Sequence, residues 1–517
     1  MKPSARSSAT VVREIEHKFS VAALFQLPDL TVAGQFQVQS LEPVTQTAVY
    51  YDTVDLRLFR WGITLRRREG GNDPGWHLKL PVEITGGSRH VRDELQLPLV
   101  DHPGSSVPDE FAMLLPGFVR EGALLPVVTL RTLRLTYLVQ DPKGQAVAEL
   151  VDDTVSVLNG RTVAARFREI EVEERGEPQA ITDLINALRL AGAVPSSISK
   201  AATALGPAST AAADVPLPAP VGLDEPAAAA VRSYLTGQVR AFLFADLNVR
   251  RDAPDSVHQL RVSVRRLRSA LRTFAPLLAP GFGEHLRAEL GWLASELGDS
   301  RDTEVMLLRL DDHAAVLPGE DMTLVRNLLS EVLPHRLAVA RERAMSALES
   351  HRQLELVGNL VDQATSLEFA PPSERPSRDA LPPLADAAWV KLRRAGQHLR
   401  LDGKSDEWHR VRILAKRARY TTEALTAIFG PPAQLRASAL AQVTECLGEH
   451  QDAWLAQLTL HELSRRDGIT GAEGFALGLL HEHERACEYA ARHKFTEIWA
   501  QVRLTHREAK LDESWRA

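Results

Sequence analysis

The hydrophobic periodicity of this 517-residue chain changes once, near residue 205. Before that point, short segments such as EIEHKFSV and FREIEVEE alternate apolar and polar residues, with turn residues between them. This pattern is typical of an antiparallel all-β unit, either a sandwich or a barrel. From about residue 226 the spacing becomes that of helices and stays so. The sequence therefore predicts a two-domain α+β protein, with a β unit over residues 10–204 and an all-α unit over residues 226–510.

Two proline-rich segments divide the chain further. Residues 205–225 are rich in Pro, Ala and Ser and poor in large apolar residues, which is typical of a linker. A second break, FAPPSERPSRDALPPL at 369–384, separates two helical parts, about 226–368 and 384–510. We expect each part to be a compact bundle of helices.

The two helical parts repeat each other in sequence. HQLRVSVRRLR, which begins at His258, returns as HRVRILAKRAR from His409. LGDSRD, which begins at Leu297, returns as LGEHQD from Leu447. Both motifs recur in the same order after roughly 150 residues, which indicates an internal duplication.

Cysteine content and hydropathy indicate a soluble protein of a reducing compartment. Cys446 and Cys487 are the only cysteines, far apart and in no C-x-x-C motif. No apolar run reaches the roughly 18 residues of a membrane span, and MKPSARSSATVV lacks the apolar core of a signal peptide. The net charge of −6 is mild, so a local basic cluster is informative. We expect a cytoplasmic protein without a membrane partner.

Charged side chains recur at every second position of several predicted strands. In REIEHKF, Glu14, Glu16 and Lys18 share one face, because successive side chains of a strand point to opposite sides. The same parity groups further residues, namely Arg66 with Arg68, His77 with Lys79, Arg92 with Glu94 and Gln96, Glu149 with Asp153, and Glu169 with Glu171 and Glu173. In VTLRTLRL we expect Arg131 to be the inward arginine, since Arg134 has the other parity.

These charges have two interpretations. They are either solvent-facing charges on the outer sides of amphipathic strands, as exposed charges usually are, or the lining of a cavity. Buried charges persist when they are paired, hydrated or coordinating a ligand. Arginine and lysine bind phosphoryl oxygens, and carboxylates hold Mg²⁺ or Mn²⁺. The second interpretation therefore predicts a site for a metal-bound polyphosphate chain.

The order of these motifs resembles that of CYTH domains, also called triphosphate tunnel metalloenzymes. EIEHK resembles the family's ExExK signature, and YYDTVDLRLFRWGITLRRR, ELVDD, FREIEVEE and SISK follow in the family's order over about residues 10–204. The resemblance implies an eight-stranded antiparallel tunnel that binds a triphosphate together with Mg²⁺ or Mn²⁺.

The resemblance also implies roles for individual residues. The metal-site candidates are Glu14, Glu16, Glu169, Glu171 and Glu173, and which of the last three bind metal stays open. The triphosphate-binding candidates are Lys18, Arg66, Arg68, Lys79, Arg131 and Lys200. Lys18, Glu149 and Asp153 are the catalytic candidates, the two carboxylates supporting the metal or the water.

The predicted helix from His258 carries a basic stripe. Residues on one side of it are His258, Arg261, Arg265, Arg268 and Arg272, and His409, Arg412, Lys416 and Arg419 repeat the stripe. Like charges at these spacings repel, so the stripe either pairs with glutamates of neighbouring helices or forms a groove for a long polyanion. No recognition motif or row of aromatic side chains favours nucleic acid.

HxxRVxxRRLR followed by LGxxRD resembles the CHAD domain, a conserved-histidine α-helical domain built from two related four-helix halves. The resemblance covers about residues 226–510 and implies binding of inorganic polyphosphate. The implied contacts are His258, Arg261, Arg265, Arg266, Arg268, His409, Arg412, Lys416, Arg417 and Arg419. The two histidines are also potential metal ligands, but no matching carboxylate motif accompanies them.

Together these features predict an inorganic triphosphatase that hydrolyses tripolyphosphate in the β-tunnel and binds long polyphosphate through its helical domain. Association with polyphosphate granules would follow from such binding. One alternative is a non-catalytic polyphosphate-binding protein. Another is a tunnel enzyme that acts on thiamine triphosphate or cyclises ATP, although no sequence feature favours an adenine pocket.

Overall fold

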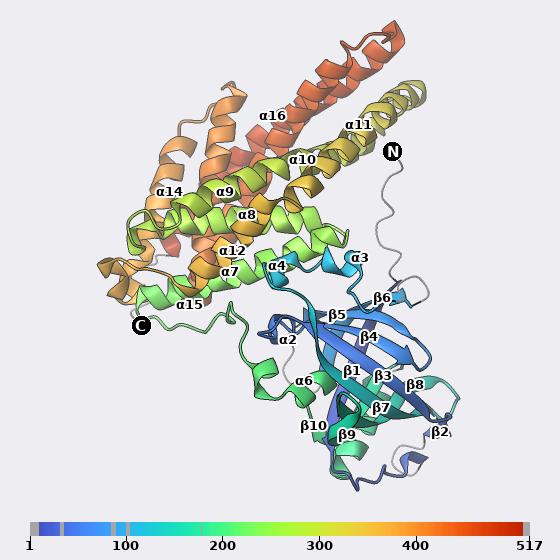
Figure 1. Ribbon diagram of the computed structural model, residues 1–517. Coiled ribbons are helices and arrows are strands. Elements are labelled where there is room, and N and C mark those ends of the chain that lie inside the picture. The colour runs from blue at the N-terminus through green and yellow to red at the C-terminus, as the bar shows by residue number, and fades with distance from the viewer. Residues whose placement is uncertain (1–9, 32–35, 84–88, 100–103, 177, 510–517) are drawn as a thin grey trace. The chain divides into compact units, whose positions relative to one another are not determined.

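The computed structural model describes residues 10–31, 36–83, 89–99, 104–176 and 178–509 (Figure 1). Tertiary contacts divide the chain into two units, Met1–Asp214 and Val215–Ala517. The division falls inside the segment 205–225 that was predicted to be a linker. Residues on its N-terminal side are fixed to the first unit, where the Trp61 indole N–H donates to Asp214 at 2.7 Å and Arg60 donates to the carbonyl of Ala212 at 2.8 Å.

The first unit is built from antiparallel strands. They are β1 (Thr10–Val21), β2 (Gln37–Ser40), β3 (Val44–Asp52), β4 (Thr64–Gly70), β5 (Gly75–Glu83), β6 (Arg89–Pro98), β7 (Leu125–Gln140), β8 (Ala146–Asn159), β9 (Thr162–Glu174) and β10 (Val194–Pro195). Short helices α2 (Arg57–Arg60), α3 (Asp109–Ala112), α4 (Pro116–Val119) and α6 (Lys200–Leu205) and the longer α5 (Pro178–Leu190) accompany them.

Eight of these strands close into a barrel, which confirms the predicted fold class. The order β1-β6-β5-β4-β3-β7-β8-β9 returns to β1, because β9 pairs with β1 from Glu16↔Glu173 to Val21↔Arg168. Figure 1 shows the strands wrapped around a common axis. β10 adds to β1, and β2 adds to β7. Closure leaves the eight barrel strands without a free edge.

The main apolar core of this unit lies outside the barrel. Phe19, Ile170 and Val172 alternate with charged residues along β1 and β9, and their side chains are fully buried against Leu184 and Leu188 of α5. In a strand, residues of opposite parity face opposite sides. Because the apolar side chains of β1 and β9 lie on the outer face, the charged side chains that alternate with them face the interior of the barrel.

Asp52, at the end of β3, fixes the turn that leads into α2. Its carboxylate is fully buried and accepts hydrogen bonds from the backbone N–H groups of Thr53, Leu58 and Phe59, at 2.6, 2.8 and 2.9 Å. The N–H groups of Leu58 and Phe59 lie in the first turn of α2, where they have no partner within the helix, and that of Thr53 lies in the turn before it. The aspartate of the YYDT segment therefore has a structural role, because it holds the turn between β3 and α2.

Asp52→Ala should loosen α2 locally. Loss of a charged acceptor leaves three buried N–H groups without a partner, so the amides of Leu58 and Phe59 should exchange about ten- to a hundredfold faster. Hydrogen exchange measured by mass spectrometry on the peptide spanning these residues tests this. Asp55→Ala is the matched control, because the Asp55 side chain is half exposed. Equal protection in the two variants would contradict this role for Asp52.

The second unit is helical. Its helices are α7 (Ala227–Arg250), α8 (Ser256–Thr273), α9 (Glu284–Glu296), α10 (Gly298–Ala314), α11 (Gly319–Leu348), α12 (His351–Thr365), α13 (Ser377–Ala380), α14 (Pro382–Gly396), α15 (Ser405–Leu463) and α16 (Gly471–Glu508). None of the helices that the structure describes is long and apolar enough to cross a membrane.

The internal duplication is visible in this helix order. α15 comprises two helices that meet at Gly430, whose φ of 57° and ψ of −137° lie outside the helical region. The second half thus runs α14, the two parts of α15 and α16. The first half runs α7, α8, the pair α9–α10 and the pair α11–α12. The His258 and His409 motifs occupy equivalent helices, α8 and the first part of α15.

Candidate functional site

The interior of the barrel is lined by charges of both signs. The buried or half-buried inward side chains include the cations Lys18, Arg66, Arg68, Lys79, Arg134 and Lys200 and the carboxylates Glu14, Glu16, Glu94, Asp153, Glu169 and Glu171. Strand register places cations beside carboxylates on neighbouring strands, since Lys79 is opposite Glu94 on β5–β6 and Lys18 is opposite Glu171 on β1–β9. The interpretation of these residues as exposed outer charges is therefore wrong.

Lys200 is the centre of one group of charges. Its ammonium nitrogen lies 2.9 Å from Asp153, 2.9 Å from Glu169 and 2.6 Å from Glu171. Lys18 adds a second ammonium 2.7 Å from Glu171. Burial opposes the charge of Lys200, but the three carboxylates raise its pKa well above the usual value. The first turn of α6, capped by Ser199, thus places a cation against two strands.

Glu94 is the centre of a second group. His77 Nδ1 lies 3.0 Å from its carboxylate, Arg66 lies at 3.5 Å and Lys79 at 3.8 Å. Although burial raises the pKa of Glu94, Lys79 and its other partners bring it far below the usual value. Sequence parity had placed His77 and Glu94 on this face without assigning them a role.

Glu14 and Glu16 differ in their ionisation although they are neighbours on β1. Burial raises the pKa of Glu14 to about 7, despite an ion pair with Lys79. Burial also raises the pKa of Glu16, but the charges of Lys18 and Lys79 outweigh this effect and lower the pKa to about 2. At neutral pH, Glu16 is fully ionised and Glu14 is about half protonated.

The inward arginine of β7 is Arg134, and the prediction of Arg131 is wrong. Arg134 pairs with Asp153 through hydrogen bonds of 2.7 and 3.0 Å and lies 3.6 Å from Glu171, whereas Arg131 is exposed. The parity is fixed by Leu130, which is 1% exposed and packs inside one end of the barrel with Tyr50. Residues four apart in a strand share a face, so Arg134 faces the interior as Leu130 does.

The remaining predicted tunnel residues differ in their exposure. Glu149 and Glu173 are 30% and 25% exposed and both contact Arg175. Arg68 is buried and pairs with Asp73, a residue of the β4–β5 turn that carries no motif. Burial and the neighbouring Arg66 lower the pKa of Arg68 to about 10.

Tyr50 is a tunnel residue that sequence reasoning missed. It lies opposite Arg66 on β3–β4, and although burial raises its pKa, the Arg66 guanidinium brings it below the usual value. Its parity with Asp52 in YYDT was the available signal, but an aromatic residue in a strand is usually assigned to the apolar core.

Some tunnel carboxylates have donor atoms available for a cation. Glu16 Oε1 and Glu169 Oε1 are buried, and their only polar contacts among the described residues are with the ammonium groups of Lys18 and Lys200, at 3.4 and 2.9 Å. Oxygen donors of this type suit hard divalent cations such as Mg²⁺ and Mn²⁺. The residues present therefore fit the metal that the tunnel family implies, and Glu16 and Glu169 are the carboxylates best placed to hold it.

In the helical unit, the two histidine motifs face each other. α8 and α15 are in contact, with the hydroxyls of Thr273 and Thr421 2.8 Å apart. Burial and the charges of Arg412 and Arg265 lower the pKa of Lys416 to about 7. The Nε atoms of Arg265 and Arg412 are buried and have no hydrogen-bond partner. The two copies thus converge on one crowded cationic cluster.

A second group of cations extends this cluster along α8. Burial lowers the pKa of Arg268, and so do the charges of Arg272 and Arg287. Burial also lowers the pKa of Arg417, and the charges of Arg272 and Arg268 lower it further. Arg265 and Arg268 are about one turn apart, so these cations lie on one face of α8.

Other residues of the stripe are paired, as the solvated-face alternative predicts. Arg261 bonds to Asp302 at 3.0 Å, while Arg266 and Arg419 share Glu423 at 3.4 and 2.6 Å. The two histidines differ: His409 Nδ1 lies 2.6 Å from the Gln451 amide oxygen. Burial lowers the pKa of His258, with Asp255 opposing and Arg301 reinforcing the effect.

Comparison with known proteins shows the same two domains. Residues 12–201 match the CYTH domain and residues 233–461 match the CHAD domain. The chain therefore belongs to the proteins in which a CYTH domain precedes a CHAD domain. It is 30% identical over 498 residues to Uncharacterized protein Rv2226 of Mycobacterium tuberculosis, covering 91% of this chain and 92% of that protein.

Two solved structures each resemble one part of the chain. PptA from Streptomyces chartreusis is 28% identical and matches 53% of this chain and 100% of its own, with a TM-score of 0.47. HpAC1 from Hippeastrum, described as having a dominant triphosphatase activity, is 21% identical and matches 38% of this chain and 98% of its own, with a TM-score of 0.26. CYTH tunnel proteins act on phosphate compounds and in general require a metal.

Arg134→Ala should weaken tripolyphosphate binding about tenfold or more, because a charge-assisted contact inside the barrel is lost. Arg131→Ala, which removes the same side chain from the outer face of the same strand, should change binding by no more than about twofold. Isothermal titration calorimetry on both variants makes the comparison. Stronger loss in Arg131→Ala would refute the inward assignment of Arg134.

Mn²⁺ affinity should increase by about tenfold between pH 6 and pH 8, because Glu14 binds a cation only as the carboxylate and its pKa of about 7 lies inside this range. Glu14→Gln should flatten this increase. Glu69→Gln, at an exposed position of β4, should retain it. Calorimetric titrations at both pH values measure the change, and an unaltered pH dependence in Glu14→Gln would contradict the expectation.

Proposed function

We propose that the tunnel hydrolyses inorganic tripolyphosphate with a divalent cation and that the helical unit binds long-chain inorganic polyphosphate. The observation that supports the first part is the lining of a closed barrel by buried ammonium, guanidinium and carboxylate groups. Without a ligand these groups pair with one another. A triphosphate and a divalent cation together would offer a partner to both signs, since phosphoryl oxygens suit the cations and the metal suits the carboxylates.

The residues divide into roles by their contacts. Lys18, Arg66, Arg68, Lys79, Arg134 and Lys200 are the groups that would bind the triphosphate oxygens. Glu16 and Glu169 would hold the cation, and Glu14 would be a further ligand once it is ionised. The bound cation would polarise a phosphoryl group and activate water. Lys18 lies between Glu16 and Glu171, so it can neutralise charge at the terminal phosphate beside the carboxylate site.

The acidic residues near the metal site would position the attacking water and receive its proton. Asp153 is fully buried and already engaged by Arg134 and Lys200. Glu149 is more exposed, and burial together with Glu149 raises the pKa of Glu173. A carboxylate with a raised pKa is a suitable proton acceptor near neutral pH. Glu173 and Glu149 therefore join Asp153 as the groups that would handle the proton.

The second part of the proposal is supported by the cluster of Arg265, Arg412 and Lys416. Burial lowers the pKa of Arg412 and of Lys416, and the charge of Arg265 adds to the effect while Asp452 opposes it. An anion would stabilise the charged forms of both groups, and a chain of phosphates would supply several anionic groups along the stripe of α8. Binding of this kind depends on charge and shape and should weaken steeply with added salt.

Phosphate release by the purified full chain tests the enzymatic part. Tripolyphosphate, pyrophosphate, ATP, thiamine triphosphate and long polyphosphate are compared, each with Mg²⁺ and with Mn²⁺. We expect metal-dependent turnover of tripolyphosphate that falls by at least about a hundredfold in Glu16→Gln, as is typical when a group that stabilises the transition state is removed. Glu69→Gln serves as the control.

Each other outcome assigns the site differently. Faster turnover of thiamine triphosphate, or conversion of ATP to a cyclic product, would keep the tunnel as an enzyme and replace its substrate. No turnover of any substrate, with long-chain binding intact, would leave a polyphosphate-binding protein and remove the catalytic assignments.

Polyphosphate affinity should fall by roughly tenfold between pH 6 and pH 8. Lys416 is charged below its pKa of about 7, and bound phosphate favours the charged form, so binding is strongest at low pH and weakens as pH rises through 7. Lys416→Arg should abolish this dependence, because arginine stays protonated. Lys391→Arg, at an exposed position of α14, is the control. Fluorescence anisotropy with labelled polyphosphate measures both.

A further inference from the structure

A group of nitrogen and sulfur side chains lies in the helical unit, apart from the basic stripe. His313 comes from α10, and His483 and Cys487 come from α16, where they are one turn apart. One ligand atom from each residue can be chosen so that all three lie within 4.8 Å of one another. None of the three residues belongs to the motifs described above, and the proposed function uses none of them.

The spacing within α16 suits a common ligand. Side chains four residues apart share a helix face, and Cys487 Sγ lies 3.7 Å from His483 Nε2. A tetrahedral zinc ion with bonds of about 2.0 Å to nitrogen and 2.3 Å to sulfur holds those two atoms about 3.5 Å apart. The helix therefore presents two ligand atoms at close to the separation that zinc requires.

A buried carboxylate orients the third side chain. His313 Nδ1 lies 2.7 Å from Oε1 of Glu484, whose side chain is fully buried. Arg309 fixes the other oxygen of Glu484 at 2.8 Å. A histidine that donates Nδ1–H to a carboxylate keeps the lone pair of Nε2 available for a metal, an arrangement found around many zinc ions. The rings of His313 and His483 are perpendicular, with centroids 4.9 Å apart.

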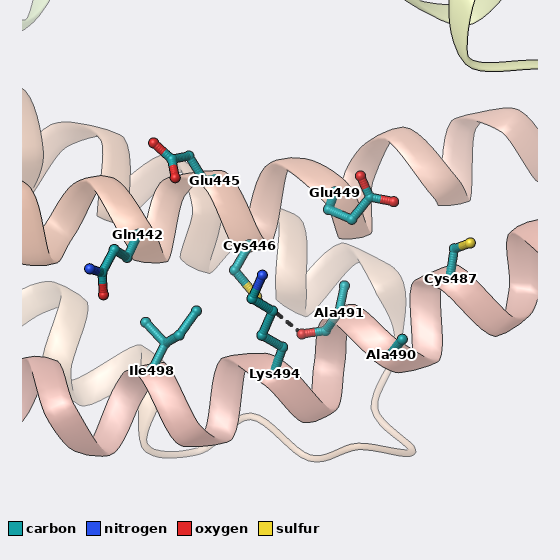
Figure 2. A pocket seen from close by; sticks show the side chains of 9 residues that line it. All are labelled: Gln442, Glu445, Cys446, Glu449, Cys487, Ala490, Ala491, Lys494 and Ile498. Atoms are coloured by element: carbon teal, nitrogen blue, oxygen red, sulfur yellow. Dashed lines mark hydrogen bonds between the residues drawn. The ribbon is translucent and has the colours of Figure 1, made fainter. Parts of the chain in front are cut away.

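The site borders a groove between α15 and α16. Figure 2 shows Glu449 and Cys487 at one end of this groove and Gln442 and Ile498 at the other. The groove has a volume of about 580 Å³. Three protein ligands beside an open groove leave a fourth coordination position for water or for an exogenous ligand.

We propose that His313, His483 and Cys487 bind one Zn²⁺ ion. The set of two imidazoles and one thiolate selects a borderline-soft metal and disfavours Mg²⁺ and Mn²⁺, which prefer oxygen. On binding, the Cys487 S–H bond breaks, its proton passes to solvent, and both sulfur electrons bind the metal as a thiolate, without oxidation or reduction. Since α10 belongs to the first helical half and α16 to the second, the ion would cross-link the duplicated halves.

Cobalt(II) provides the sharpest test, because a thiolate ligand gives a charge-transfer band in the near ultraviolet. The full chain is reduced, stripped of metal and titrated with Co²⁺, and then with Zn²⁺ as competitor. The tunnel unit contains no cysteine, so its carboxylates cannot produce the band. We expect saturation at one equivalent of Co²⁺ and displacement by Zn²⁺.

Variants assign the ligands. Cys487→Ser should abolish the band, and His313→Asn and His483→Asn should each weaken binding by about tenfold or more. Cys446→Ser and His481→Asn are matched controls and should retain it, since Cys446 bonds to the carbonyl of Ala491 instead.

Thermal unfolding supplies an independent measurement. Zn²⁺ should raise the unfolding temperature of the wild-type chain and of Cys446→Ser but not that of His313→Asn, because only an intact site joins the two halves. Absence of a band in the wild type, or its persistence in Cys487→Ser, would overturn the proposal. So would loss of the band in Cys446→Ser alone. His483→Asn replaces Cys487→Ser should that variant fail to fold.

Discussion

Most of the charged side chains that the structure describes inside the barrel are largely removed from water, and the opposite charges around them offset the cost. The ammonium of Lys200 illustrates the constraint, because three carboxylates surround it within 2.9 Å. An isolated charge in such a place costs many kcal/mol, and a pair recovers that cost only with good geometry. Closure of the strands, the docking of α6 and the parity of each strand all serve to bring these partners together.

The same constraint bears on the proposed substrate of the barrel. A metal-bound polyphosphate carries both signs, so it can replace the internal ion pairs without leaving a bare charge behind. The helical unit contrasts with this arrangement. Around Arg412, burial and the charge of Arg265 lower the pKa of the guanidinium, and Asp452 and Asp302 offset this effect only in part. The tunnel charges thus compensate one another, whereas the cations around Arg412 are compensated only in part.

Much of this architecture could be read from the sequence, because periodicity reports directly on which face is buried. The change near residue 205 and the recurrence of the His258 motif gave two units and a duplication, and parity grouped Glu14, Glu16 and Lys18. Parity failed in β7 for a physical reason. The segment Leu130-Arg131-Thr132-Leu133-Arg134 repeats a leucine–arginine pair at an offset of three, so either arginine can face inward.

Only tertiary packing decides between the two arginines. Leu130 fills one end of the barrel, whereas Leu133 is 45% exposed, and no local signal distinguishes these leucines. The pairing of Asp73 with Arg68 could not be predicted, because residues in turns have no periodicity that indicates which way they face. His313, His483 and Cys487 could not have been grouped beforehand, since helices from different halves of the duplication bring them together.

The position of Lys200 has a further consequence for how the chain may be divided. This lysine is the last tunnel side chain in the sequence, and the residues after it, up to Asp214, are bound to the barrel through Trp61 and Arg60. A chain ending at Asp214 would therefore contain the complete tunnel lining and the contacts that hold its closing segment. The charged side chains that line the barrel therefore all come from the first unit.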